Sequence, residues 1–221
     1  MKLNVSEWKE FKIGELFRIE STKGVNSTEL LEGDEISYIA AKYEDNGLAM
    51  RCQLNGFEGW VSEGNCIVFI QLGAGSAGYA VYAPSDFIGM SGKTACGYIE
   101  DKMNPSVGLF LSTILCQERP KYSYGRSWTG ERLKSTVIKL PVLRDPDTHN
   151  PILDPNKKYS SEGYIPDFEY MENYIKSLNH KPITTTCGGA NKLQLGIDKW
   201  EEFKLSKICS IQMAKSNDKG S

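Results

Sequence analysis

The chain has 221 residues, of which 40% are hydrophobic and 10% aromatic, so it can bury a substantial core and wholesale disorder is not expected. No run approaches the roughly 20 apolar residues of a membrane-spanning helix, and the N-terminus lacks the apolar segment of a signal peptide. With a net charge of −2, these features predict a cytoplasmic protein without membrane contact.

The first half of the chain is predicted to consist of β-strands. Four apolar segments, at residues 36–40, 48–54, 66–72 and 79–82, are separated by Gly, Asn and Asp turn signals. Asn46-Gly47 lies between the first two segments and is typical of a tight hairpin turn. The 21 glycines and 9 prolines agree with a strand-rich fold.

The segment from Gly73 to Gly78 matches the G-x-G-x-x-G pattern of dinucleotide and S-adenosylmethionine sites. Such a site needs a helix directly after the glycines, with its N-terminus facing the ligand. Residues 79–83 have the pattern of a strand instead, and Pro84 would end a helix before its second turn. We therefore expect a hairpin connection, and a small S-adenosylmethionine-binding methyltransferase is the alternative.

Helices are expected in the second half of the chain. Asn104-Pro105 precedes an apolar segment, 107–116, and these two residues are typical of a helix N-cap and first turn. Residues 136–142 predict a strand, and residues 144–166 a turn-rich connector. The predicted class is therefore α+β: a strand-rich domain with a buried helix, followed by an amphipathic spacer helix.

This spacer helix is predicted to begin at Asp167, a good N-cap. Its apolar residues are spaced three or four positions apart, so they share one face; they are Phe168, Met171, Ile175 and Leu178. The face would pack either on its own domain or on a partner helix. Its place just before a repeated segment favours a spacer that presents this face to a partner.

The repeated segment is residues 8–19, which align without gaps with residues 200–211. The identical pairs are Trp8/Trp200, Glu10/Glu202, Phe11/Phe203, Lys12/Lys204 and Ile19/Ile211. A repeat of this kind defines the domain organisation. It predicts a complete domain over 1–145, a connector and spacer helix over 146–196, and the start of a second, truncated unit over 197–221.

Basic residues are concentrated between Arg119 and Arg144, where seven cations face one acid, Glu131. Local positive charge favours phosphate binding, although a solvated basic surface is the alternative. The candidate DNA-binding residues here are Lys121, Tyr122, Tyr124, Arg126, Trp128, Arg132 and Lys134, with Lys42, Arg51 and Lys93 as secondary candidates. At least one of Tyr122, Tyr124 and Trp128 is expected to be buried.

Catalytic and metal-binding motifs are not evident. The six cysteines include no C-x-x-C pair, which argues against a structural zinc site. The two histidines, His149 and His180, lie in polar segments and supply no convincing Cys–His or Ser–His pair. We therefore expect neither a metal site nor an enzyme.

The segment Lys121-Tyr122-Ser123-Tyr124-Gly125-Arg126-Ser127-Trp128, followed by Ile138-Lys139-Leu140-Pro141, resembles the end of a target-recognition domain. Such domains occur in the specificity subunits of type I restriction-modification systems and in related type IIB and IIG enzymes. The opening segment 8–19 and the helix from Asp167 to Ile175 are similar to the same family. The resemblance covers about residues 5–180 and restarts at 197.

This resemblance implies a non-catalytic subunit that reads part of a split site in double-stranded DNA. It also implies that the chain docks modification subunits, which bind S-adenosylmethionine and methylate a flipped-out adenine, and that restriction subunits join for cleavage. The chain departs from the family in having one complete unit and a short spacer helix, so a truncated gene or a designed fragment is expected. A homodimer through the spacer helices is a hypothesis. A β-rich protein- or carbohydrate-binding module is the other alternative.

Overall fold

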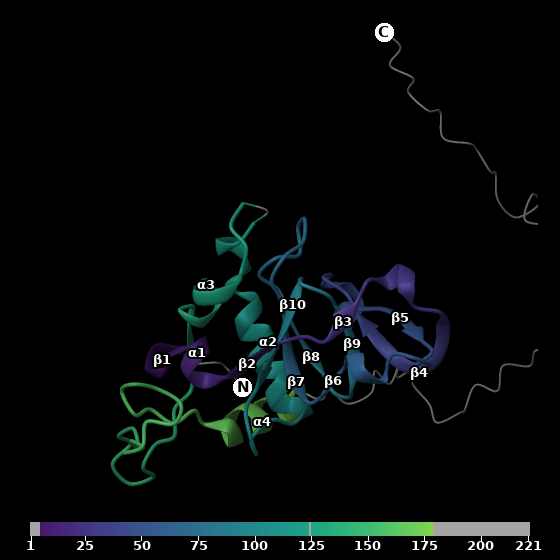
Figure 1. The fold of residues 1–221 in the computed structure, drawn as a ribbon. Coiled ribbons are helices and arrows are strands. Elements are labelled where there is room, and N and C mark those ends of the chain that lie inside the picture. Colours follow the sequence, from purple (N-terminus) through teal and green to yellow (C-terminus); the bar gives the residue numbers. More distant parts are fainter. Residues whose placement is uncertain (1–4, 124, 179–221) are drawn as a thin grey trace, which may run out of the picture. The chain divides into compact units, whose positions relative to one another are not determined.

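The computed structural model describes residues 5–123 and 125–178 (Figure 1). The strands are β1 (Lys9–Lys12), β2 (Arg18–Ser21), β3 (Gly24–Val25), β4 (Glu32–Ile39), β5 (Leu48–Cys52), β6 (Val61–Ser62), β7 (Cys66–Ile70), β8 (Ala80–Ala83), β9 (Phe87–Met90), β10 (Thr94–Tyr98) and β11 (Val137–Leu140). The α-helices are α1 (Ile13–Leu16), α2 (Pro105–Cys116), α3 (Gly130–Lys134) and α4 (Phe168–Ser177). The predicted α+β class and the four predicted strands are confirmed.

The strands form three sheets. One is four-stranded and antiparallel, in the order β2-β10-β7-β8. The second has the order β3-β9-β4-β5, with β6 paired to β9, and contains parallel pairs such as Ile39 opposite Gly89. β1 and β11 form a separate antiparallel pair. A shared apolar cluster, which includes Ile39, Val68 and Phe87, packs the first two sheets together (Figure 1).

Strands β4, β7 and β9 run in the same direction, as strand pairing and the hydrogen bonds at both ends of β7 and β9 show. β4 and β9 are parallel neighbours. Before β7 and β9, the backbone N–H of Gly64 donates to Asp86 Oδ1 at 2.8 Å. After these strands, the N–H of Gln71 donates to the carbonyl of Lys93 at 2.9 Å. The loops that follow β4, β7 and β9 therefore gather at one end of the sheets.

Helix α2 begins as predicted. Asn104 Oδ1 accepts hydrogen bonds from the N–H groups of Ser106 and Val107 at 3.0 Å, which satisfies two donors of the first turn. Gly108 lies against the ring of Tyr82 so closely that an added Cβ would come within 2.2 Å of it. The helix thus packs directly on β8 and carries the centre of the largest apolar cluster.

Helix α4 also begins as predicted, with Asp167 Oδ1 accepting from the Tyr170 N–H at 2.8 Å. Its apolar face, however, packs on its own domain: Met171 is fully buried, and Phe168 and Ile175 contact the same cluster as α2. Of the two alternatives for this face, packing on its own domain is the one that the structure shows for these three residues, and the buried Met171 is not available to a partner helix. Only Leu178 is exposed.

The turn between β4 and β5 is longer than predicted. Ile39 pairs with Leu48, so eight residues separate the strands instead of a two-residue Asn46-Gly47 turn. Asp45 and Asn46 carry the left-handed conformation, with φ of 51° and 54°, which Asp and Asn tolerate better than most residues. A short 3-10 helix (Glu44–Gly47) closes the loop.

The connector and α4 lie in the same compact unit as the strands, over the described residues 5–123 and 125–178. The predicted second unit at 197–221 lies outside the described residues. No helix among the described residues is long and apolar enough to cross a membrane.

Candidate nucleic-acid interface

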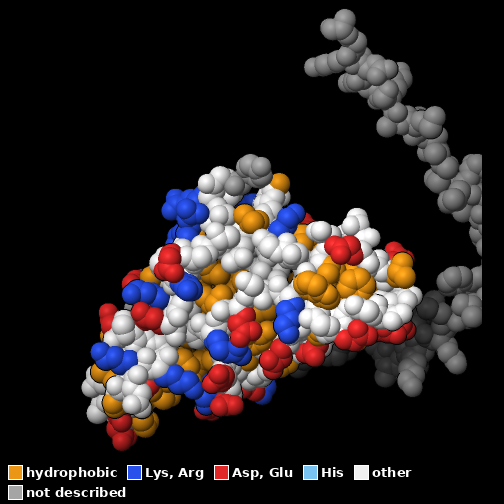
Figure 2. All heavy atoms as spheres, in the orientation of Figure 1, with side chains coloured by type: hydrophobic (Ala, Val, Ile, Leu, Met, Phe, Trp, Pro, Cys, Tyr) orange, Lys and Arg blue, Asp and Glu red, His pale blue; other side chains and the backbone are white. Residues whose placement is uncertain are grey.

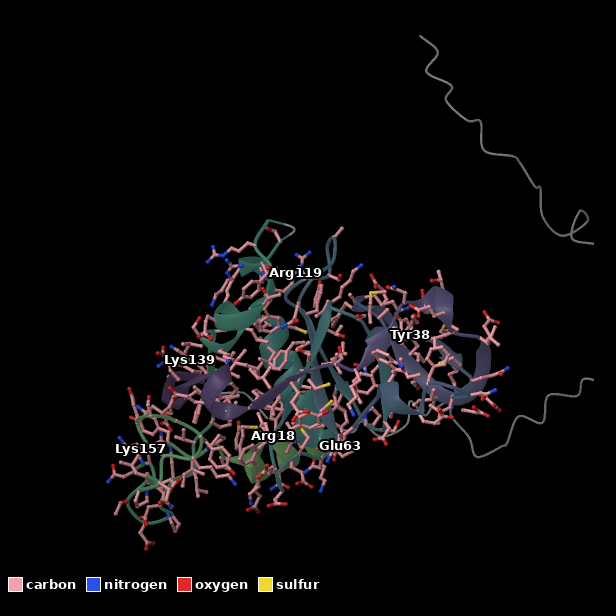
Figure 3. All side chains as sticks on the ribbon, viewed as in Figure 1. Arg18, Tyr38, Glu63, Arg119, Lys139 and Lys157 are labelled. Carbon is pink, nitrogen blue, oxygen red and sulfur yellow. The ribbon has the colours of Figure 1, made fainter. Side chains whose placement is uncertain are left out.

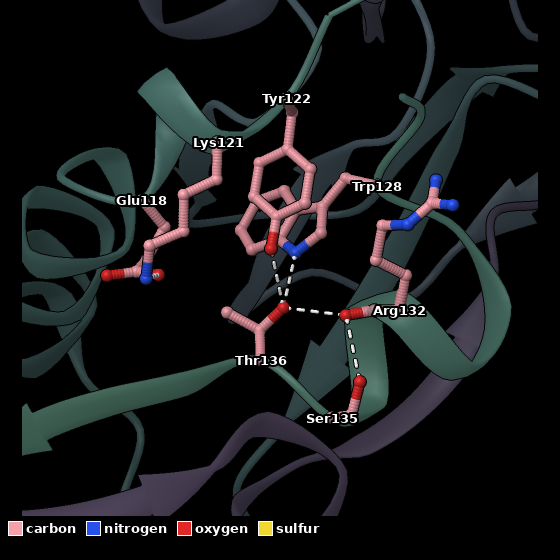
Figure 4. Close-up of polar contacts among 7 residues, drawn as sticks. All are labelled: Glu118, Lys121, Tyr122, Trp128, Arg132, Ser135 and Thr136. Atoms are coloured by element: carbon pink, nitrogen blue, oxygen red, sulfur yellow. Dashed lines mark hydrogen bonds and ion pairs between the residues drawn. The ribbon is translucent and has the colours of Figure 1, made fainter. Parts of the chain in front are cut away.

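The basic segment is fastened to the domain by a buried polar cluster around Thr136 (Figure 4). Thr136 Oγ1 donates its single hydrogen to the carbonyl of Arg132 at 2.7 Å. Its lone pairs are then free to accept from Trp128 Nε1 at 3.0 Å and from the Tyr122 hydroxyl at 2.7 Å. One hydroxyl thus pairs with two buried donors and one backbone carbonyl, and we call this arrangement the Thr136 cluster.

Two of the predicted DNA-binding aromatics are therefore core residues. Trp128 is fully buried, stacks on Tyr122 with ring centroids 5.1 Å apart, and meets Phe69 edge-on at 5.3 Å. Tyr122 is 9% exposed. Neither ring can reach DNA without unfolding the segment, so both assignments are wrong, while the expectation that at least one aromatic is buried is confirmed. Tyr124 lies outside the described residues.

Between these buried residues the chain projects a short loop. Ser123 and Arg126 exchange two backbone hydrogen bonds, of 3.1 and 3.0 Å, which close a tight turn. Arg126 is exposed, and no described residue pairs with its guanidinium. Arg132 is also exposed, and its Nη1 donates to the Ser127 carbonyl at 2.6 Å. Arg132, in α3, therefore lies beside the loop that carries Arg126.

Hydrogen bonds join the loop 71–79 to the basic segment, to the turn 91–93 and to the loop 40–47. The Trp128 N–H donates to the Gln71 carbonyl at 3.0 Å, and Gln71 N–H to Lys93 O at 2.9 Å. Ser76 Oγ donates to the carbonyl of Ala41 at 2.7 Å. We define the basic end as residues 40–47, 71–79, 91–93, 118–123 and 125–134.

The glycines of loop 71–79 serve packing and turning. β7 and β8 on either side pair antiparallel, so the predicted hairpin connection is confirmed and the helix required by a cofactor site is replaced by a strand. Gly78 has φ +93°, and an added Cβ would lie 2.8 Å from the Tyr122 ring. Only glycine allows this approach. The methyltransferase alternative, which depended on these glycines, is therefore not favoured.

Cations outnumber acids at the basic end. Seven basic side chains (Lys42, Lys93, Arg119, Lys121, Arg126, Arg132 and Lys134) accompany four acidic ones (Glu44, Asp45, Glu118 and Glu131). Figure 2 shows Lys and Arg side chains gathered at the upper left of the view, over α3 and the neighbouring loop. Positive charge concentrated in this way attracts phosphates.

The opposite ends of the same strands are acidic. We define the acidic end as residues 32–35, 51–65, 84–86 and 99–104. It contains eight acidic residues (Glu32, Asp34, Glu35, Glu58, Glu63, Asp86, Glu100 and Asp101) and two basic ones, Arg51 and Lys102. Figure 3 shows Glu63 at the bottom of the view and Arg119 at the top.

Arg51 lies at the acidic end, so the structure does not bring it to the other predicted cations. Its guanidinium donates to the backbone carbonyl of Asp34 and shares a shallow pocket with Glu35 and Asp86. These carboxylates would repel phosphate. Its assignment as a DNA-binding residue is therefore not supported by its position.

Three predicted lysines have acidic neighbours. Lys42 lies 3.0 Å from Asp45, Lys134 lies 3.7 Å from Glu131, and Lys121 pairs with Glu118. Lys121 also lines a groove with Trp8 and Lys139 beside β1 and β11. It therefore lies at the edge of the basic end that is next to these two strands. Lys93 is exposed in the turn before β10.

Three further residues at this end were not predicted as site residues. Arg119 lies over the ring of Tyr79, and Tyr79 stacks on Tyr43. The sequence indicates Arg119 only as one cation of the basic segment, and nothing in the local sequence distinguishes the two tyrosines. Arg119, Tyr79 and Tyr43 come into contact only because the fold brings together loops that are distant in sequence.

The cysteines of the described region are free. Cys52, Cys66 and Cys96 are buried, and burial raises the pKa of the Cys52 and Cys116 thiols. Such thiols are poor nucleophiles. Among residues 5–123 and 125–178, no group of His, Cys, Asp and Glu side chains is arranged to hold a metal ion.

Comparison with known proteins finds one family over most of the chain. The family described as "Type I restriction modification DNA specificity domain" matches residues 5–180. The specificity subunit S.BcgI of the type II restriction enzyme BgcI from Heyndrickxia coagulans is 24% identical over 182 residues, covering 81% of this chain and 46% of that protein. The chain thus spans about half the length of this curated relative.

Two solved structures of specificity subunits also match part of the chain. One is the S subunit of a type I restriction-modification system from M. genitalium, with a TM-score of 0.44, 21% identity, and coverage of 61% of this chain and 34% of the other. The second is the HsdS subunit from Thermoanaerobacter tengcongensis, with a TM-score of 0.48, 15% identity, and coverage of 80% and 38%.

Proposed function

The chain belongs to the family of type I restriction modification DNA specificity domains, and from this premise we propose that its basic end recognises one part of a split DNA site. The observation that carries this proposal is the gathering of Arg126, Arg132 and Lys93 at the strand ends where four loops meet. The overall charge of −2 gives no reason to expect such a surface.

The residues divide naturally between two tasks. Exposed lysine and arginine side chains such as Lys93 and Arg132 would contact phosphates and fix the position of the domain on the duplex. Arg126, at the projecting turn, would reach a base edge, where an arginine can grip guanine with two parallel hydrogen bonds. The Thr136 cluster supports this division, because it holds both ends of the projecting loop in place.

We further propose that the chain is non-catalytic and acts with partner subunits. Modification subunits would carry S-adenosylmethionine and methylate the DNA, and restriction subunits would cleave it. Membership of the specificity family and the absence of a cofactor-type helix after Gly78 support this view. A homodimer through the apolar face of α4 is not proposed, because Phe168, Met171 and Ile175 of that face pack on their own domain.

Selection from a pool of randomised duplexes tests the proposal. The full chain, alone and with its modification subunit, is incubated with the pool at several salt concentrations, and the retained duplexes are sequenced. We expect a short motif to be enriched, with affinity that falls as salt rises. If no motif is enriched even with the modification subunit present, the proposal is wrong.

A further inference from the structure

Arg119, Tyr79 and Tyr43 form a continuous stack across the basic end. The Arg119 guanidinium carbon lies 5.3 Å from the Tyr79 ring centroid. The Tyr79 ring in turn lies 4.1 Å from that of Tyr43, with an angle of 19° between the ring planes. The three residues come from three separate segments: 118–123, 71–79 and 40–47.

The stack is also tied to the backbone. Arg119 Nη2 donates to the carbonyl of Gly75 at 3.0 Å, at the tip of the 71–79 loop. Arg119 therefore makes two contacts with this loop: a hydrogen bond to the Gly75 carbonyl and a cation–π contact with the Tyr79 ring. Only a planar guanidinium can stack on a ring and donate in its own plane at the same time. Tyr79 in turn restrains Tyr43 by ring stacking. The loop of Tyr43 is also joined to loop 71–79 by the hydrogen bond from Ser76 to Ala41.

Arg119 is poorly placed to bind phosphate itself. The residue is half-buried, and its Nε is buried without a hydrogen-bond partner among the described residues. Arg126, Arg132 and Lys93 are more exposed and are available for that task. Tyr43, at the outer end of the stack, is 47% exposed and adjoins Lys42.

We propose that Arg119 is a positioning residue for DNA sequence discrimination, acting through Tyr79 and Tyr43 to fix loops 40–47 and 71–79 against the projecting arginine loop. This inference rests on the proposed function. Base-edge contacts require accurate placement of side chains, whereas phosphate attraction tolerates loose loops. Loss of the stack therefore lowers discrimination between sequences and leaves non-specific binding in place.

The test compares Arg119→Lys and Tyr79→Leu, which break the stack, with Tyr79→Phe, which keeps the ring. Affinity of each full-length variant is measured for the selected duplex and for a scrambled duplex across a salt series. We expect the first two variants to lose at least tenfold in the ratio of the two affinities, with scrambled-duplex binding and salt dependence within twofold of the wild type. Tyr79→Phe is expected to keep the wild-type ratio within twofold.

A second measurement needs no DNA. Hydrogen exchange of the free proteins is expected to be faster in 40–47 and 71–79 for Arg119→Lys and Tyr79→Leu than for Tyr79→Phe, while the exchange of β7 and β10 is unchanged. Faster exchange of those strands as well would mean a general loss of stability, and would overturn the positioning role.

The outcomes separate the two proposals. A wild-type chain that does not distinguish the duplexes overturns the proposed function and this inference with it. A discriminating wild type with unaltered ratios in Arg119→Lys and Tyr79→Leu overturns this inference alone. Equal losses on both duplexes for Arg119→Lys, with none for Tyr79→Leu, would identify Arg119 as a direct DNA ligand that does not act through the stack, and would also overturn it.

Discussion

The two ends of strands β4, β7 and β9 carry opposite charge. The basic end has seven basic and four acidic residues, whereas the acidic end has eight acidic and two basic residues. The net charge of the whole chain, −2, shows neither the excess of basic residues at one end nor the excess of acidic residues at the other. The comparison teaches that strand direction, which decides where each loop lies, determines the electrostatics of this domain, and that composition alone conceals it.

The ends also differ in how they are held. At the basic end, one buried hydroxyl in the Thr136 cluster satisfies the Tyr122 hydroxyl and the Trp128 ring N–H. At the acidic end, the hydrogen bonds are partly exposed, such as that from the Tyr98 hydroxyl to the carbonyl of Glu63 at 3.0 Å. Solvent can replace a lost partner at the acidic end more readily than at the basic end.

The largest expected effect follows from this difference in burial. Thr136→Val keeps the shape of the side chain but leaves the Trp128 N–H and the Tyr122 hydroxyl without a partner. Each unsatisfied buried donor costs about 1–3 kcal/mol, so with two of them we expect the free energy of unfolding to fall by about 2–6 kcal/mol. Urea denaturation measures it.

The matched control is the neighbouring Ser135→Ala. Ser135 is exposed, and its hydroxyl makes one long hydrogen bond of 3.5 Å to the Arg132 carbonyl. A change within about 0.5 kcal/mol is expected. If Thr136→Val were as mild as this control, the Thr136 cluster would not be what fastens the basic segment.

The charge difference between the ends is tested by one arginine from each. Arg132→Ala, which removes a proposed phosphate contact at the basic end, is expected to weaken binding of a non-specific duplex about tenfold and to reduce the salt slope by about one. Arg51→Ala, at the acidic end, is expected to leave both quantities within about twofold. Fluorescence anisotropy over a salt series gives both numbers, and a larger loss for Arg51→Ala would reverse the assignment of the ends.

A smaller effect is expected from Tyr98→Phe. This substitution removes the hydrogen bond to Glu63 but leaves a carbonyl that water can reach, so the loss of stability should be about 1 kcal/mol. DNA affinity should not change. A loss of stability as large as that of Thr136→Val would show that the two ends are held equally.

The smallest effect concerns Glu15, which lines a pocket with Tyr98 and Glu100 beside the acidic end. The backbone N–H of Ser161, 2.8 Å from the carboxylate, holds the pKa of Glu15 below its usual value of 4.5. Because the folded-state pKa is lowered, the ionised carboxylate stabilises the fold above about pH 4.5, and this contribution is lost as the pH falls through the folded-state pKa.

Comparison of the wild type with Glu15→Gln measures this contribution. At pH 7 the wild type should be more stable by less than about 1 kcal/mol, because the site is partly exposed to solvent. The difference should shrink as the pH is lowered from 6 to below 4. A difference that is constant over this range would show that ionisation of Glu15 does not matter.

Much of the fold could be predicted from local sequence. The caps Asn104 and Asp167 and the strands β4, β5, β7 and β8 each depend on signals within a few residues. The hairpin between β7 and β8 could be predicted for the same reason, because Pro84 excludes the helix that a cofactor site requires. The resemblance to the specificity family also came from contiguous motifs.

The site could be predicted only in part, because its membership depends on distant contacts. An aromatic residue in a basic loop can serve DNA or the core, and the burial of Trp128 is decided by Thr136 and Phe69. Likewise, the position of Arg51 at the acidic end depends on the pairing of β4 with β5. Arg119, Tyr79 and Tyr43 meet only after three loops have come together.

The claim that the basic end contacts DNA is tested most directly by hydrogen exchange of the full chain with and without the selected duplex. We expect slower exchange in residues 40–47, 71–79, 91–93, 118–123 and 125–134 on binding, and unchanged exchange in residues 51–65, 84–86 and 99–104. Protection of the acidic end, with the basic end unchanged, would contradict the account.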